Sequence, residues 1–96
     1  MHVVTVLFTI QAAHYPNFLS AMLQNAATSL ADEPGCSQFD VCEGTNHTIF
    51  LYEIYADAAA FELHLASKHF VAFNQKTAPW VANKQVQIFS RCEALP

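Results

Sequence analysis

The sequence predicts a single α+β domain over residues 1–96, in which strands and helices alternate in the order βαββαβ. Two observations near the N-terminus begin this pattern. Residues 2–10 are rich in β-branched and aromatic side chains, which favour a strand. Between Tyr15 and Leu30 the apolar residues recur every three or four positions, which is the spacing of one helix face. The sequence Glu33-Pro34-Gly35 then ends this helix.

Two further strand-like runs follow the first helix. They cover residues 36–43 and 48–55, and both are rich in apolar or β-branched side chains. The intervening Gly44-Thr45-Asn46 is a sequence typical of a turn. A connection this short joins antiparallel neighbours, so the two runs predict a hairpin.

The C-terminal part of the chain predicts two short helices and a last strand. Asp57 and Ser67 are favoured N-cap residues, and they precede helical stretches over 58–66 and 68–78. The last strand covers residues 84–92, where polar and apolar residues alternate. The complete order is that of a ferredoxin-like fold, an antiparallel sheet with helices on one face.

The composition predicts that a second copy of the chain covers the other face of this sheet. Apolar residues make up 53% of the sequence and charged residues only 12%, whereas about 25% charged residues is usual for a soluble domain. In the first strand Val3 and Leu7 alternate with Val4, Val6 and Phe8, so both faces of the strand are largely apolar. A face without helices would leave an apolar patch exposed in a monomer. We therefore expect a homodimer through the open sheet face.

Charge and length exclude several classes of partner. The formal net charge is −4 and only four residues are Lys or Arg, which argues against nucleic acid, because phosphate binding needs a basic surface. The apolar run Val3–Ile10 is too short to span a membrane, and we predict no signal peptide.

The cysteines Cys36, Cys42 and Cys92 are odd in number and form no CxxC pair, which favours free thiols in the cytoplasm.

His64 is the first candidate for chemistry. It follows Phe61 by three positions and precedes Leu65, so the three lie on one side of a helix. If Phe61 and Leu65 face the sheet, His64 reaches the space between helix and sheet. One interpretation is a histidine at the edge of the core, bonded to a backbone carbonyl. The other is a general base, since imidazole titrates near neutral pH.

Glu53 and His69 are two further candidates. Alternation places Glu53 on the same strand face as Leu51 and Tyr55, where an unpaired carboxylate would be costly to bury. It therefore pairs with a cationic residue, or it orients a catalytic imidazole or accepts a substrate proton. His69 begins a predicted helix, where a capping or surface role is the alternative to a functional one.

The sequence predicts neither a metal nor a nucleotide cofactor. His64 and His69 are five positions apart, which is not the i, i+4 spacing of helical metal ligands, and no Cys or Asp completes a ligand set. Gly35 and Gly44 are the only glycines, so a glycine-rich phosphate loop is excluded.

These segments resemble the antibiotic biosynthesis monooxygenase family. The likeness covers nearly the whole chain, and the matching residues are Pro34-Gly35-Cys36, Gln38-Phe39-Asp40-Val41, Phe50-Leu51-Tyr52-Glu53-Ile54-Tyr55, Asp57, Ala60-Phe61, His64 and Ser67-Lys68-His69-Phe70. The resemblance implies a dimeric α+β barrel with a pocket between sheet and helices in each subunit. It also implies that His64, Glu53 and His69 occupy the recurring polar positions. We assign substrate contact to five aromatic residues, Phe39, Tyr52, Phe61, Phe73 and Trp80.

The family includes oxygenases that act on phenols and quinols without a cofactor. The leading prediction is therefore a cytoplasmic monooxygenase in which His64 deprotonates a small phenol or quinol and Glu53 holds the imidazole. A second hypothesis is an isomerase that moves a proton on a small carbonyl or signal-type metabolite. A third is a dimeric ligand-binding or stress-response barrel, in which the histidines are structural.

Overall fold

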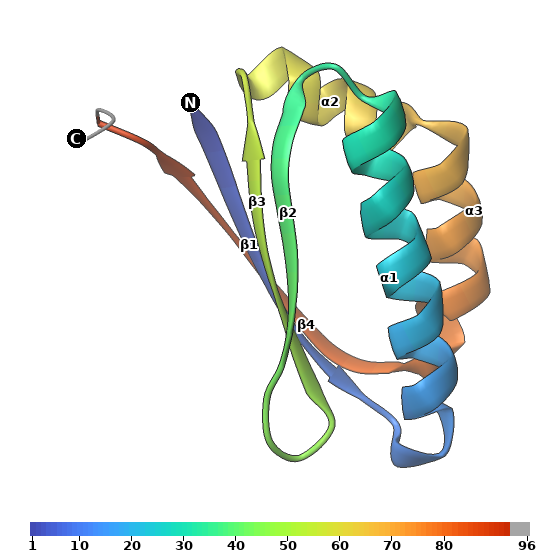
Figure 1. Cartoon of the computed structure of the whole chain (residues 1–96). Helices are drawn as coiled ribbons and strands as arrows, with labels where there is room; N and C mark the ends of the chain where they lie inside the picture. Colours follow the sequence, from blue (N-terminus) through green and yellow to red (C-terminus); the bar gives the residue numbers. More distant parts are fainter. Residues whose placement is uncertain (93–96) are drawn as a thin grey trace.

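The computed structural model describes residues 1–92, so the predicted domain end at residue 96 lies outside the described part (Figure 1). Its strands and helices are β1 (His2–Ile10), α1 (Tyr15–Asp32), β2 (Cys36–Glu43), β3 (Thr48–Tyr55), α2 (Ala58–Ala66), α3 (Lys68–Thr77) and β4 (Val81–Ser90). Two short 3-10 turns, η1 (Ala12–His14) and η2 (Ala78–Trp80), connect β1 to α1 and α3 to β4. The predicted βαββαβ order is confirmed, with the second helix divided at Ser67.

The four strands form one antiparallel sheet in the order β2-β3-β1-β4. Figure 1 shows the three helices on one side of this sheet, with α1 and α3 side by side and α2 near one end. This is the ferredoxin-like α+β arrangement. The register places Val4 of β1 opposite Glu53 on one side and Ile88 on the other, so alternate residues of β1 and β3 face the helices together.

The core lies between the sheet and the helices. Along β1 the residues that face the helices, Val4, Val6, Phe8 and Ile10, are all buried. They pack against α1, where the ring of Phe18 lies 5.1 Å from that of Phe8. Full burial of an aliphatic or aromatic side chain of this size stabilises the fold by about 1.5–3 kcal/mol. The alternate residues of β1 therefore form the sheet face that α1 covers.

The predicted boundaries agree with the structure to within two residues except at the start of the last strand. β4 begins at Val81, three residues before the predicted start, and ends at Ser90. The difference arises because Val81 pairs with Ile10 across an irregularity in the ladder, which extends the pairing to the end of β1. The helix caps are confirmed: Asp57 accepts a hydrogen bond from the Ala60 amide at 2.8 Å, and Ser67 accepts one from the Phe70 amide at 3.3 Å.

The opposite face of the sheet has no helix over it in the described part of the chain (Figure 1). Leu7, Phe50 and Phe89 lie on this face, and Phe50 and Phe89 are 38% and 49% exposed. The open face therefore leaves apolar side chains uncovered in a single chain.

Every helix among residues 1–92 is too short or too polar to cross a membrane.

Candidate functional site

A cavity of about 230 Å³ lies between the sheet and the helices. Its walls are mainly apolar and include Phe39 from β2, Phe61 from α2 and Phe73 from α3. The polar residues that line it are Asn25, Glu53, His64, Asn74 and Lys84. An apolar cavity of about 150 Å³ is large enough for benzene, so this one has room for a single aromatic ring with small substituents.

His64 forms part of the cavity wall and is only 2% exposed. It is held in α2 among aromatic rings, with ring centres at 4.9 Å for Phe70 and 5.4 Å for Tyr55. Its Nδ1 lies 2.9 Å and 3.1 Å from the two carboxylate oxygens of Glu33. The prediction that His64 occupies the space between helix and sheet is thus confirmed, and the ring is fixed in position.

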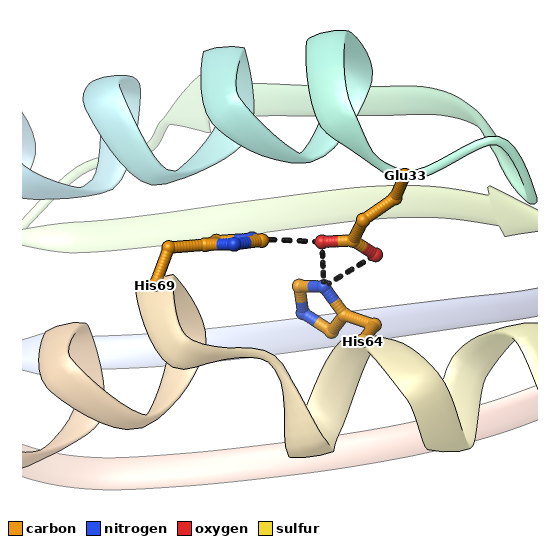
Figure 2. A group of neighbouring side chains, drawn as sticks. All are labelled: Glu33, His64 and His69. Atoms are coloured by element: carbon orange, nitrogen blue, oxygen red, sulfur yellow. Dashed lines mark hydrogen bonds and ion pairs between the residues drawn. The ribbon is translucent and has the colours of Figure 1, made fainter.

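Glu33 is the residue that sequence reasoning missed. It directly follows α1, and its backbone N–H bonds to the carbonyl of Ser29 at 3.0 Å, so the carboxylate extends from a helix end toward α2 (Figure 2). The expectation that Glu53 holds the imidazole is corrected, because Nδ1 of His64 bonds to Glu33. In the sequence Glu33 is recognisable only as part of a helix stop. It lies 31 positions before His64, so no local pattern links the two residues.

The chain that follows Glu33 approaches α2 closely. A Cβ atom on Gly35 would lie 2.5 Å from the Cβ of Ala60, which is closer than two carbon atoms approach without displacement. Gly35 therefore lets the end of α1 lie against the first turn of α2. This contact brings Glu33 within bonding distance of His64.

The two nitrogens of His64 have different surroundings. Within residues 1–92 the hydrogen bonds of its ring all use Nδ1. Nε2 has no such bond to the described residues, and it is not fully buried, so it is accessible. Burial lowers the pKa of His64, although the Glu33 carboxylate acts in the opposite direction. A neutral ring with its hydrogen on Nδ1 donates to Glu33 and leaves Nε2 as an acceptor.

His69 lies on the other side of the Glu33 carboxylate. Its Nε2 is 2.7 Å from Oε2 of Glu33 and 3.1 Å from the hydroxyl of Ser29 (Figure 2). His69 does not line the main cavity; it lines a shallow groove between α1 and α3 together with Thr28 and Lys76. The structure therefore brings His64 and His69 together through Glu33, while only His64 reaches the cavity.

Glu53 enters the cavity from the sheet. It lies on β3 opposite Val4 and Phe39, is 3% exposed, and accepts a hydrogen bond from the hydroxyl of Tyr55 at 2.5 Å. Burial raises the pKa of Glu53 to about 7, although the Tyr55 hydrogen bond and the charge of Lys84 act against this rise. Glu53 is thus a second titratable group in the cavity.

The five predicted substrate contacts divide into two sets. Phe39, Phe61 and Phe73 line the cavity. Tyr52 belongs to the opposite sheet face, because it alternates with Glu53 on β3, and this corrects its assignment to the pocket. Trp80 lies in η2 and stacks on His14 with ring centres 5.5 Å apart, so it is also outside the cavity lining.

Comparison with known families identifies the family and the fold. The family model described as "Antibiotic biosynthesis monooxygenase" matches residues 1–76. The chain belongs to this family. No curated protein matches the chain.

Several solved structures share this fold. A protein from Nitrosomonas europaea that bears the family name has a TM-score of 0.90 and 23% identity, covering 97% of this chain and 100% of that one. One from Caulobacter crescentus has a TM-score of 0.91 and 23% identity, covering 96% and 90%. A Mycobacterium tuberculosis protein has a TM-score of 0.89 and 15% identity, covering 99% and 98%. A monooxygenase-like function is therefore the coarse assignment for the chain.

Within this antibiotic biosynthesis monooxygenase domain, Glu33, His64 and His69 also have the composition of a metal ligand set. Each offers one ligand atom, and these atoms lie within 4.8 Å of one another. We expected no Cys or Asp to complete a set with the two histidines, and the third possible ligand is instead a glutamate, Glu33, which directly follows α1. Sequence spacing does not reveal this group, because Glu33 follows α1 while His64 lies in α2 and His69 in α3.

Proposed function

We propose that the protein is a monooxygenase that oxidises a small phenol or quinol without a cofactor, using His64 as the general base. The observation that carries this proposal is the placement of His64, whose Nδ1 is held by Glu33 while its ring lines an apolar cavity. A carboxylate bonded to Nδ1 fixes the tautomer and leaves Nε2 to accept a proton from a bound hydroxyl.

The reaction balances without an external reductant. Nε2 takes the hydroxyl proton, and the electron-rich anion reacts with oxygen at a ring carbon. For a simple hydroquinone, one oxygen atom remains in the hydroxyquinone product and the other leaves as water. All four electrons come from the quinol. The apolar walls support this chemistry because they keep bulk water from the anion and its oxygen adduct.

Glu53 provides a second proton-transfer group on the sheet side of the same cavity. With a pKa of about 7 it exchanges a proton near neutral pH, as acid–base catalysis requires. We assign to it the proton that the oxygen adduct needs when water leaves. His69 is assigned a positioning role, since it contacts Glu33 and not the cavity.

Oxygen consumption with a simple quinol tests the proposal. The wild-type chain is expected to consume oxygen and to place one atom from ¹⁸O₂ in the product, whereas His64→Gln is expected to be at least ~100-fold slower. Oxygen uptake that is equal in the variant would overturn the role of His64. The absence of uptake with phenols and quinols would overturn the reaction.

Proton transfer on a small carbonyl compound is the second candidate. The observation that favours it is the pair of titratable groups, His64 on α2 and Glu53 on β3, that line one cavity. Exchange of substrate hydrogen for deuterium without oxygen consumption would identify this isomerase. Ligand binding without turnover would identify the third candidate, a dimeric binding or stress-response barrel.

We propose further that the protein is a cytoplasmic homodimer that assembles through the open sheet face. The exposed Leu7, Phe50 and Phe89 support the dimer, because such a patch is stabilised by burial against a second copy. The three cysteines Cys36, Cys42 and Cys92 are free, which is typical of a reducing compartment.

A further inference from the structure

We infer that Glu33, His64 and His69 form a binding site for a divalent transition metal ion of the zinc type. This goes beyond the proposed oxygenation, which uses no metal. The ligand atoms are Oε2 of Glu33, Nδ1 of His64 and Nε2 of His69, and all lie within 4.8 Å of one another (Figure 2).

The ligand types select the class of ion. Two imidazole nitrogens and one carboxylate oxygen are a set that holds Zn²⁺ in many proteins, with the remaining position open to water. Mg²⁺ and Ca²⁺ prefer all-oxygen sites, so two imidazoles disfavour them. The set also carries one negative charge when both imidazoles are neutral, which suits a divalent cation.

The three side chains are close enough to share an ion after local adjustment. Nδ1 of His64 and Nε2 of His69 lie 2.9 Å and 2.7 Å from Oε2 of Glu33, which are hydrogen-bond lengths. Ligand atoms that share one Zn²⁺ lie about 3.0–3.4 Å apart, given bonds of about 2.0–2.1 Å. The ion replaces the imidazole hydrogens that now point at the carboxylate, and each nitrogen moves away from Oε2 by a few tenths of an ångström. The two nitrogens, which lie within 4.8 Å of each other, must reach the same spacing.

The surroundings allow entry and support the ligands. His69 is partly exposed and lines the groove between α1 and α3, which gives an ion a path from solvent. The hydroxyl of Ser29 lies 3.1 Å from Nε2 of His69, where it can hydrogen-bond to a water on the ion. His64 is rigid because it is buried among aromatic rings, so His69 is the ligand that adjusts.

Metal binding would also change the tautomer of His64, and the effect of this change on catalysis rests on the proposed function. A neutral imidazole bound to a metal through Nδ1 carries its hydrogen on Nε2. His64 would then present a donor to the cavity in place of an acceptor. The ion is therefore expected to inhibit oxygenation. Inhibition is measured as oxygen consumption, in an experiment separate from the measurement of binding.

Titration calorimetry of the full chain with Zn²⁺ is the primary test. We expect one Zn²⁺ per chain, and no comparable binding of Mg²⁺. His69→Gln is the main variant because its amide can still donate to Glu33, so the fold is retained. Its affinity for Zn²⁺ is expected to fall at least ~10-fold, the lower range seen even for outer residues of metal sites. Glu33→Gln is expected to lose affinity in the same way.

His47→Asn is the matched control, because it removes an exposed histidine far from the three ligands in the chain. His47 has a φ of 60°, a conformation that asparagine accepts. Equal affinity in wild type and this variant, with visible Co²⁺ absorption that His69→Gln loses, would support the site. Failure of the wild type to bind Zn²⁺, or binding that His69→Gln leaves unchanged, would overturn it. Neither result depends on turnover, so the site and the proposed oxygenation fail independently.

Discussion

Nδ1 of His64 lies 2.9 Å from a carboxylate oxygen of Glu33, although 31 positions separate the two residues. The carboxylate belongs to the end of α1 and the imidazole to a buried turn of α2. A hydrogen bond between a carboxylate and Nδ1 orients an imidazole and fixes its tautomer, as in hydrolase triads. The pair therefore defines which nitrogen of His64 is available to a bound ligand.

Replacement of His64 tests the base directly. His64→Gln is expected to lower oxygen consumption with a quinol at least ~100-fold, because general-base help is typically worth that much or more. The amide of glutamine can donate to Glu33, so the melting temperature should change little. Full activity in a folded variant would remove His64 from the mechanism. A large loss of melting temperature with unchanged turnover would mark the histidine as structural.

Replacement of Glu33 tests the orientation of the imidazole. Glu33→Gln is expected to lower kcat at least ~10-fold with a smaller change in KM, because the substrate cavity is intact while the tautomer is no longer fixed. Glu62→Gln removes the same charge from an exposed position of α2 and serves as the control. Equal kcat in the two variants would argue against a positioning role for Glu33.

The buried Glu53 carboxyl predicts a pH dependence of stability. Its pKa is about 7 in the folded chain, whereas an unperturbed glutamate has a pKa of 4.5, so the folded state binds more protons between these values. The free energy of unfolding should therefore decrease as the pH rises from about 4.5 to above 7, by up to about 3 kcal/mol.

Urea denaturation of wild type and Glu53→Gln between pH 5 and pH 8 measures this contribution. The glutamine can still accept the Tyr55 hydrogen bond, and the nearby Lys84 and Glu33 are the same in both proteins. The variant should gain stability relative to wild type as the pH rises. A difference that does not vary with pH would mean that Glu53 titrates normally.

The close contact after α1 predicts a cost for a side chain at Gly35. In Gly35→Ala the new Cβ would meet the Cβ of Ala60 at 2.5 Å, which should destabilise the fold by about 1–3 kcal/mol. Gly44→Ala is the comparison, because its Cβ would meet the Thr48 hydroxyl, which can rotate away. Chemical denaturation of both variants should therefore show the larger loss for Gly35→Ala.

The open sheet face predicts a variant that separates subunits. Phe50 is 38% exposed on this face, and Phe50→Lys would place a charge in a buried dimer interface. Light scattering should give a dimer for wild type and a monomer for the variant. Leu63→Lys, at a position of α2 that is 72% exposed, should remain dimeric. A monomeric wild type would refute the dimer.

The sequence predicted the elements of the fold well because their signals are local. Strand alternation in residues 2–10 and the N-caps Asp57 and Ser67 depend on neighbours a few positions away. His64 and Glu53 could be selected because each is a polar residue on an apolar face. The partner of His64 could not be predicted, since its Nδ1 bonds to Glu33, a residue that local patterns mark only as a helix end.

The same limit explains the misplaced aromatic residues. Tyr52 is one of the five aromatic residues assigned to substrate contact, but it is adjacent to the cavity residue Glu53 on β3, and adjacent residues of a strand point to opposite faces. Trp80 lies in the short η2 turn, where no periodicity tells which way a ring points. Tertiary contacts decide both cases.

The alternation along β3 has a consequence for how such a chain can change over time. Leu51 and Glu53 line the cavity, while Phe50 and Tyr52 lie on the uncovered face. A substitution at one set of alternate positions changes the cavity wall, and a substitution at the other set changes the uncovered face, although the two sets are adjacent in the sequence. Each surface can therefore change while the other is retained, and solved structures with this backbone are 15–23% identical to the chain.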